Sequence, residues 1–266
     1  MLAPEVESRP WPEQVALDDE AYKAQLAYLF DRSAFYREKL AAAGFASAEA
    51  AGGLADIARL PLTDKAEIRA TCTPDNPIGA HLCAASSEIV RIYSTSGTTG
   101  TPSYIPLTAS DLDNWVTGSA RSYAASGISA GRRIVSTYNA GPFVAGAALG
   151  AFERLGLTHI PVGTGNTERL LAAIELLEPD AVVLTPSYAA HLAERDASLR
   201  ESSVERMLVA GEPGGGEPAF RAQLEDGWGA KVTEAMGIGD IGVSLWGSAR
   251  SRTACTSARA ASSTPS

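Results

Sequence analysis

The sequence of 266 residues is 45% hydrophobic and carries 31 acidic against 22 basic side chains, which gives a formal net charge of −9 at pH 7. This length and apolar content allow a sizeable core in one large domain or two smaller ones. The acidic balance and the lack of a Lys/Arg cluster argue against a nucleic acid partner. The three cysteines lack metal-ligand spacing and indicate thiols in a reducing compartment. The N-terminus shows no signal-peptide pattern, so we expect a cytoplasmic protein.

The N-terminal region is expected to be helical. Apolar residues recur at three- and four-residue intervals between residues 14 and 45, and Gly44 is a suitable stop signal. Asp64 and Glu67 have the spacing of a capping box and predict the start of another helix. We therefore expect a packed helical part over residues 1–85.

A loop between two β-prone runs is the most informative stretch of the sequence. The runs cover residues 89–93 and 104–107, and hydroxyl and glycine residues dominate the loop between them. The candidate ligand-binding residues of this loop are Thr95, Ser96, Gly97, Thr98, Thr99 and Gly100. Glycine lets the backbone approach a ligand closely, while amide and hydroxyl groups donate hydrogen bonds to phosphate oxygens. The composition is typical of a phosphate-binding loop, but it is also typical of a flexible hairpin turn.

Helices and strands are expected to alternate after residue 108. The pattern predicts helices at residues 108–125, 144–155, 167–177, 188–195 and 218–228. It predicts strands at residues 133–138, 158–162, 181–185, 206–210 and 231–235. Such alternation implies right-handed crossovers, and hence an α/β fold with a mainly parallel sheet covered on both faces.

Residues 134–152 are uncharged over a length that could cross a bilayer. Polar residues, glycines and a proline interrupt this stretch, among them Asn139, Gly141 and Pro142. They divide it into a strand, a loop and the start of a helix. We therefore expect a buried strand–loop–helix and no membrane partner.

Two other kinds of motif are discounted. Residues 237–242 match GxGxxG, but a dinucleotide fingerprint needs a following helix, a further strand and an acid about twenty residues on. His81, His159 and His191 each lack a partner at i+3 or i+4, which favours packed or solvated imidazoles. No GxSxG elbow is present, so the sequence offers no protein nucleophile and we assign no catalytic residue.

The loop sequence Ser-Gly-Thr-Thr-Gly-Thr-Pro at residues 96–102 resembles the phosphate loop of the adenylate-forming, or AMP-binding, enzymes. The order of motifs from residues 60–63 onward resembles the phenylacetate-CoA ligase branch of that superfamily. The matching downstream segments are residues 138–150, 185–188 and 210–213, followed by Arg221, Glu225 and Trp228. The resemblance covers about residues 10–246.

The resemblance implies an AMP-forming acyl- or aryl-CoA ligase that uses ATP, Mg²⁺ and coenzyme A to activate a small carboxylic acid. The loop residues Thr95 to Gly100 would then hold phosphates. The implied nucleotide-binding residues are Gly211, Glu212, Pro213, Met236 and Gly237. Asp240 would serve the metal, and Tyr138, Pro142 and Phe143 would line the acyl pocket. Whether the protein forms a homodimer is left open.

The chain departs from the family pattern at several places. Thr101 stands where the family commonly has Lys, and residues 236–240 read Met-Gly-Ile-Gly-Asp in place of Tyr-Gly-x-Ser/Thr-Glu. The ribose-binding Asp, the hinge and the C-terminal domain with its catalytic Lys are missing. Residues 247–266 contain no acid and no Leu, Ile, Val or aromatic residue, and such a segment cannot bury enough apolar surface to order itself.

We therefore expect residues 1–246 to be an incomplete adenylate-forming N-terminal domain, with its β/α part over residues 86–246. Residues 247–266 are expected to be a disordered tail foreign to the fold, left by truncation, for instance after a frameshift. Two alternatives to a ligase stay open at this point. The first alternative is a nucleotide- or acyl-binding protein without turnover, and the second is an inactive product of a gene fragment.

Overall fold

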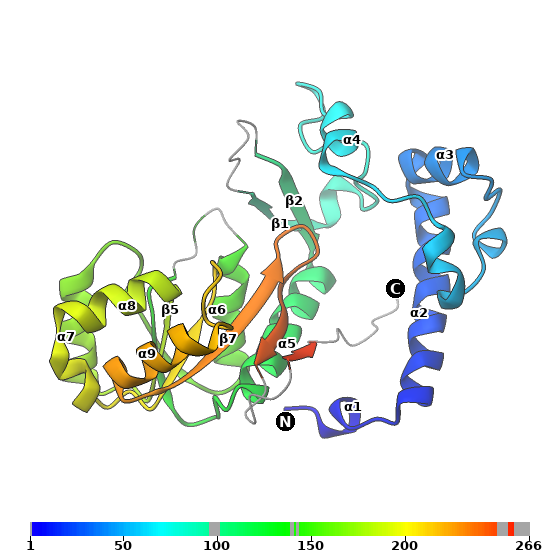
Figure 1. The fold of residues 1–266 in the computed structure, drawn as a ribbon. Coiled ribbons are helices and arrows are strands. Elements are labelled where there is room, and N and C mark those ends of the chain that lie inside the picture. The colour runs from blue at the N-terminus through cyan, green and yellow to red at the C-terminus, as the bar shows by residue number, and fades with distance from the viewer. Residues whose placement is uncertain (1, 96–101, 139–140, 142–143, 249–254, 258–266) are drawn as a thin grey trace. The chain divides into compact units, whose positions relative to one another are not determined.

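The computed structural model describes residues 2–95, 102–138, 141, 144–248 and 255–257 (Figure 1). The chain divides into two compact units, which we consider one at a time. The helical unit is Pro4–Leu112, and the sheet unit is Asp113–Ala260 together with Met1–Ala3. The domain boundaries expected from the sequence, after residues 85 and 246, stay a prediction.

The helical unit is built from short and long helices around a small apolar core. Its helices are α1 (Pro4–Glu7), α2 (Trp11–Arg32), α3 (Ala34–Ala42) and α4 (Lys65–Ala70), and its 3₁₀ turns are η1 (Glu49–Ala51), η2 (Leu54–Arg59) and η3 (Ser86–Glu88). Leu26 and Leu40 pack with Phe45 and Ala51, and all four side chains are buried. This core joins α2 and α3 to the segment that follows them.

The helix predicted over residues 14–45 is in fact two helices, because the chain breaks at Ser33. Ser33 has extended backbone angles (φ −124°, ψ 112°), and its hydroxyl accepts a hydrogen bond from the Tyr36 N–H at 3.3 Å. A serine in this role caps the N-terminus of α3 and competes with continuation of α2. By contrast, the predicted capping box of α4 is confirmed, since Asp64 and Glu67 each bond the other's backbone N–H at 2.9 Å.

Both strands predicted around the loop of hydroxyl and glycine residues are confirmed. Strand β1 (Ile89–Ser94) pairs antiparallel with β2 (Tyr104–Thr108), and Tyr93 lies opposite Ile105. Tyr93, Ile105 and Leu107 are buried, so one face of this hairpin is packed. The hairpin holds the two ends of the intervening loop at adjacent positions.

The sheet unit contains one sheet of seven strands flanked by helices (Figure 1). Its strands are β3 (Arg133–Ser136), β4 (Thr158–Pro161), β5 (Ala181–Leu184), β6 (Arg206–Val209), β7 (Lys231–Ile238), β8 (Gly242–Ser248) and β9 (Cys255–Ser257). Its helical elements are α5 (Ala109–Ala125), which begins in the helical unit, α6 (Ala145–Arg154), α7 (Thr167–Leu177), α8 (Pro186–Arg195), η4 (Ala197–Glu201) and α9 (Pro218–Trp228). The order is β4-β3-β5-β6-β7-β8-β9, and the first five strands are parallel. The predicted α/β fold with a mainly parallel sheet is therefore confirmed.

Alternate residues of the central strands supply two cores, one on each face of the sheet. Ile134, Val183 and Leu208 pack with residues of α5 and α6. Val135 and Val182 belong to the other core, which α7, α8 and α9 cover. Successive side chains of a strand point to opposite faces, so apolar runs such as Ala-Val-Val-Leu in β5 fit a sheet buried on both sides.

Strand β8 was not predicted, and it explains the GxGxxG match. Gly237 lies in β7, where a Cβ atom would come within 2.2 Å of the Val243 carbonyl oxygen. Glycine here permits close approach of the antiparallel strand β8. The rejection of a dinucleotide fingerprint is thus confirmed, because the motif spans a β-hairpin.

The expected disordered tail falls partly inside this hairpin region. Residues 247 and 248 belong to β8, and β9 pairs antiparallel with β8. The other tail residues, 249–254 and 258–266, lie outside the described residues. In the part of the chain that the structure describes, no helix is long and apolar enough to cross a membrane.

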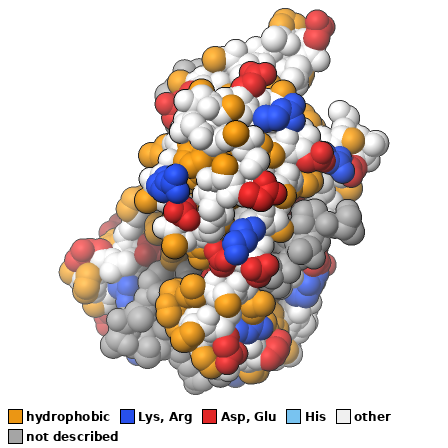
Figure 2. All heavy atoms as spheres, turned by 90° about the vertical axis from the view of Figure 1, so that its right-hand side faces the viewer, with side chains coloured by type: hydrophobic (Ala, Val, Ile, Leu, Met, Phe, Trp, Pro, Cys, Tyr) orange, Lys and Arg blue, Asp and Glu red, His pale blue; other side chains and the backbone are white. Residues whose placement is uncertain are grey.

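Charged side chains of both signs are interspersed on the face that Figure 2 shows. In the helical unit, Lys23 pairs with Asp19 at 2.6 Å and Arg59 pairs with Asp56 at 3.1 Å. Exposed ion pairs of this kind contribute little to the free energy of unfolding. The cores described above therefore carry most of the stability.

Truncation of a core leucine tests this assignment. Leu224 in α9 is 1% exposed, and Leu224→Ala is expected to lower the free energy of unfolding by about 2–5 kcal/mol, since it removes buried methyl groups and leaves a cavity. Leu176 in α7 is 76% exposed, so Leu176→Ala should change it by no more than about 0.5 kcal/mol. Urea denaturation followed by circular dichroism measures both variants, and equal losses would contradict the assignment.

Candidate functional site

The sheet unit has a topological switch point at the carboxyl ends of β3 and β5. Strand β4 lies on one side of β3 and β5 on the other, although β3 precedes both in the chain. The connection after β3 leads to α6 on one face of the sheet, and the connection after β5 leads to α8 on the other. In open α/β sheets, ligands bind outside the carboxyl ends of the strands at such a point. The residues that follow β3, β5 and β6 are therefore the candidate site.

Tyr138 follows β3 and reaches across the switch point. Its hydroxyl donates to the Ala210 carbonyl oxygen at 2.9 Å and lies 3.5 Å from that of Leu184. Burial raises the pKa of the Tyr138 phenol above its ordinary value of 10.0. The phenol therefore stays protonated at neutral pH and serves as a hydrogen-bond donor.

Gly211 and Glu212 continue from Ala210 and hold the connection after β5. Gly211 has φ of 97°, in the left-handed region that favours glycine. A Glu212 carboxylate oxygen accepts the Ser187 N–H at 2.6 Å in the first turn of α8. A carboxylate at a helix N-terminus is favourable because that end carries unsatisfied N–H donors.

A run of three glycines after Pro213 packs tightly against the neighbouring strands. A Cβ atom on Gly215 would lie 2.3 Å from Val209 Cγ2, and one on Gly216 would lie 2.8 Å from a Glu234 carboxylate oxygen. Arg221 Nε donates to the Gly215 carbonyl oxygen at 2.7 Å. Sequence reasoning missed this support, although the run Gly-Gly-Gly is visible in the sequence.

Ser136, the last residue of β3, and His159, in β4, form a part-buried pair. Ser136 Oγ lies 2.8 Å from His159 Nε2, and the imidazole packs against Phe152 with 5.0 Å between ring centroids. Burial lowers the pKa of His159 below its ordinary value of 6.5. Of the two predicted alternatives, a packed or a solvated imidazole, the structure shows the packed one at His159, and its serine partner was missed because it lies 23 residues away in the chain.

In the helical unit, Thr95 and Ser103 close the base of the loop between β1 and β2. The Thr95 N–H donates to the Ser103 carbonyl oxygen at 3.0 Å, and the Ser103 N–H donates to Thr95 Oγ1 at 3.0 Å. The Thr95 hydroxyl thus accepts one hydrogen bond and keeps its own proton to donate. The other loop residues, Ser96, Gly97, Thr98, Thr99 and Gly100, lie outside the described residues.

The remaining predicted site residues are only partly described. Pro142 and Phe143 lie outside the described residues. Met236 is 56% exposed in β7 beside Gly237, and Asp240 is exposed in the turn between β7 and β8. Within the described ranges no group of three or more His, Cys, Asp or Glu side chains could hold a metal ion.

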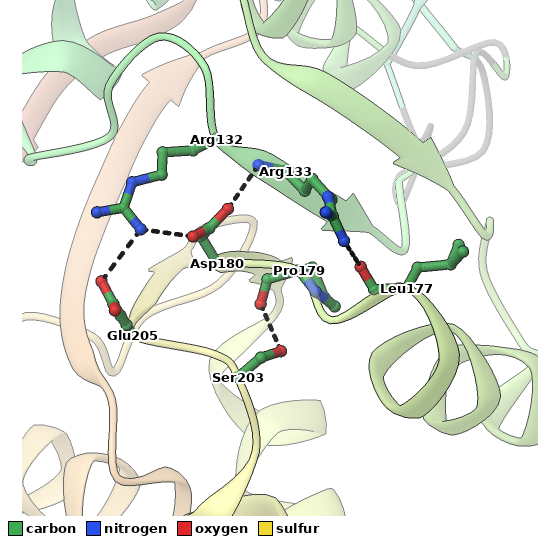
Figure 3. A network of polar contacts seen from close by, with 7 residues as sticks. All are labelled: Arg132, Arg133, Leu177, Pro179, Asp180, Ser203 and Glu205. Atoms are coloured by element: carbon green, nitrogen blue, oxygen red, sulfur yellow. Dashed lines mark hydrogen bonds and ion pairs between the residues drawn. The ribbon is translucent and has the colours of Figure 1, made fainter.

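The opposite, amino-terminal edge of the sheet carries a polar network (Figure 3). Asp180 accepts the Arg133 N–H at 2.8 Å and pairs with Arg132, which also approaches Glu205 at 3.5 Å. Burial opposes ionisation of Asp180, but these hydrogen bonds outweigh it and lower the pKa of the carboxyl. A pocket of about 610 Å³ adjoins the network. The carboxylates of Asp180 and Glu205 are both paired with arginines. We therefore interpret the network as a structural link among the starts of β3, β5 and β6.

Comparison with known proteins supplies the class. No family model matches the chain. The chain is 36% identical over 246 residues to the phenylacetate-coenzyme A ligase of Thermus thermophilus, with 91% of this chain and 54% of that protein covered. It is 32% identical over 249 residues to the Escherichia coli phenylacetate-coenzyme A ligase, with 89% and 54% covered. Among solved structures, an open conformation of 2-hydroxyisobutyryl-CoA ligase in complex with 2-HIB-AMP and CoA matches with a TM-score of 0.85 and 26% identity, covering 93% of this chain and 59% of that chain.

The chain is therefore similar, over about nine tenths of its length, to phenylacetate-coenzyme A ligases and to a solved CoA ligase of the adenylate-forming class. This similarity confirms the resemblance seen in the motifs. The chain spans about half the length of the curated relatives that it matches.

The backbone role of Gly211 is testable against a second glycine of the same unit. Gly211→Ala is expected to cost about 1 kcal/mol or more, because its φ of 97° is strained for any residue with a Cβ atom. Gly118→Ala, inside α5 with no atom within 4 Å of a new Cβ, should instead stabilise by about 0.5–1 kcal/mol. Urea denaturation measures the change in the free energy of unfolding for both variants. A stabilising effect of Gly211→Ala would contradict the role given to this turn.

The partly buried imidazole of His159 predicts a pH dependence of stability. The pKa of His159 is lower in the folded chain, so the unfolded chain binds more protons as the pH falls. The stability that neutral His159 provides is therefore present above about pH 6.5 and lost below it. Between pH 7.5 and 5.5, the wild type should lose more stability than His159→Gln. The pKa of half-buried His81 shifts in the same direction, but His81 is common to both chains, so parallel losses of stability would refute the prediction.

Proposed function

We propose that this chain is part of an AMP-forming acyl- or aryl-CoA ligase. In the first step a substrate carboxylate oxygen attacks the α-phosphorus of ATP, which gives an acyl-adenylate and releases pyrophosphate. In the second step the thiol of coenzyme A attacks the acyl carbon, which gives the thioester and releases AMP. The small carboxylic acid, ATP and coenzyme A are then its partners.

One observation carries the proposal: about nine tenths of the chain is similar to ligases that perform CoA chemistry. The sequence match covers 91% of the chain, and the structural match covers 93% with a TM-score of 0.85. The structural neighbour is a complex with an acyl-adenylate and CoA. The switch point described above lies in this matched part, and it supports a small-molecule site at the carboxyl ends of β3, β5 and β6.

The roles of individual residues are part of the proposal. Donors of the loop from Thr95 to Gly100 would bind the phosphates, because transfer of this kind needs positioning and charge stabilisation more than covalent help. The proposed nucleotide-binding residues of the sheet unit are Gly211, Glu212, Pro213, Met236 and Gly237. The proposed acyl-pocket residues are Tyr138, Pro142 and Phe143. No residue of the chain is proposed to form a covalent intermediate.

Asp240 fits a supporting role toward Mg²⁺. Mg²⁺ in phosphate-transfer sites is held by one or two carboxylates together with substrate phosphates and water. The carboxylate of Asp240 is exposed in the turn after β7, so it can serve as one such ligand. When bound, the cation would neutralise charge on the phosphates. The domain assignment of residues 1–246, the separate character of residues 247–266 and a homodimer likewise stay proposals.

Pyrophosphate exchange tests the function. The chain, supplied with a panel of aryl and aliphatic acids, is expected to exchange labelled pyrophosphate into ATP with at least one acid. Asp240→Asn should lower that exchange by about tenfold or more if its carboxylate serves the metal. Asp226→Asn, an exposed change in α9 that removes only an ion pair with Arg200, is the matched control. Binding of AMP without any exchange would reject ligase activity for this chain and favour a binding-only protein.

A further inference from the structure

We propose that Tyr138 is a positioning residue that couples the end of β3 to the end of β6, so that the proposed acyl and nucleotide sides of the site are held as one. The inference rests on the proposed function for its meaning in catalysis. The direct link between β3 and β6, which are not neighbours in the sheet, rests on the geometry alone.

The link crosses an intervening strand. In the sheet order, β5 lies between β3 and β6. The backbone already joins neighbours, since Thr137 N–H donates to Val183 O at 3.2 Å and Ala210 N–H donates to Leu184 O at 3.2 Å. The Tyr138 hydroxyl instead spans β5 and reaches Ala210, 72 residues away in the chain. A side chain of this length is required, because a hydroxyl on Ser or Thr would reach no farther than β5.

The bond is made where its loss is costly. The bond is part-buried, so the Ala210 carbonyl oxygen would lose a partner in a partly desolvated place if the hydroxyl were removed. A hydrogen-bonding group that becomes unsatisfied on burial pays the full cost of its desolvation. The interaction therefore restrains the peptide unit between Ala210 and Gly211, not merely the tyrosine ring.

The restrained peptide begins the segment proposed to bind the nucleotide. Gly211 follows it with a positive φ, and Glu212 then holds the Ser187 N–H at the start of α8. Through this series of contacts, Tyr138 fixes the connections that follow three parallel strands. We expect a change at Tyr138 to alter nucleotide affinity although Tyr138 is assigned to the acyl side.

Amide hydrogen exchange of the ligand-free chain tests the coupling itself. Tyr138→Phe should raise the exchange rate of the Ala210 amide, which donates to Leu184 O, by about tenfold, the effect of losing about 1.4 kcal/mol of local protection. Thr137→Val is the matched control, because it removes the neighbouring hydroxyl, which bonds to Val183 at 3.3 Å on β5. This control should leave the exchange rate of the Ala210 amide unchanged. Equal rates in Tyr138→Phe and wild type, or equal increases in both variants, would overturn the proposal.

Nucleotide affinity supplies the functional readout. The AMP dissociation constant should rise by about tenfold in Tyr138→Phe and by less than about twofold in Thr137→Val, by the same energy argument. An unchanged AMP dissociation constant in Tyr138→Phe would overturn the inference that this coupling supports nucleotide binding. If no form of the chain binds AMP, the proposed function fails, and exchange at the Ala210 amide still decides the coupling. Should Tyr138→Phe not fold, the wild type decides: coupling predicts that the Ala210 amide is protected as well as the amides of β6, and faster exchange contradicts it.

Discussion

Burial of one sheet on both faces is the constraint on which the rest of the sheet unit depends. Consecutive residues of β5 and β6 must each be apolar because each face meets its own layer of helices. The helices that cover the two faces are also the crossovers between successive strands, so the strands pair in parallel and their carboxyl ends lie at one edge. The connections beyond that edge carry Tyr138 and Glu212, while the Ser136–His159 pair lies within β3 and β4.

Much of this architecture could be predicted from the sequence. Apolar strands alternate with helices of 10 to 11 residues, as in α7, α8 and α9, and this alternation is enough to predict βαβ units. Two features of the fold were not predicted. The break at Ser33 depends on a single side-chain hydrogen bond within an otherwise periodic run, and β8 contains two glycines and two serines that give a weak strand signal.

The candidate site was predictable only as far as local motifs reach. The loop around Thr95 and the segment Gly211–Pro213 carry their own sequence signatures, so both could be named in advance. The bonds that Tyr138 makes with Ala210 and that Ser136 makes with His159 join residues 72 and 23 positions apart. Such pairings follow from strand order, which periodicity does not determine. The tyrosine was therefore assigned to a pocket wall, and its buried donor role became visible only in the structure.

The close approach at Gly237 has a diagnostic use. With only 2.2 Å between a notional Cβ and the Val243 carbonyl, any side chain at this position would displace the backbone of β8 from β7. The identity of one residue thus reports on the spacing of two strands. In related chains of unknown structure, a bulky residue aligned with Gly237 would mark a different path for the polypeptide after the parallel sheet, and hence a differently shaped rim beside Met236.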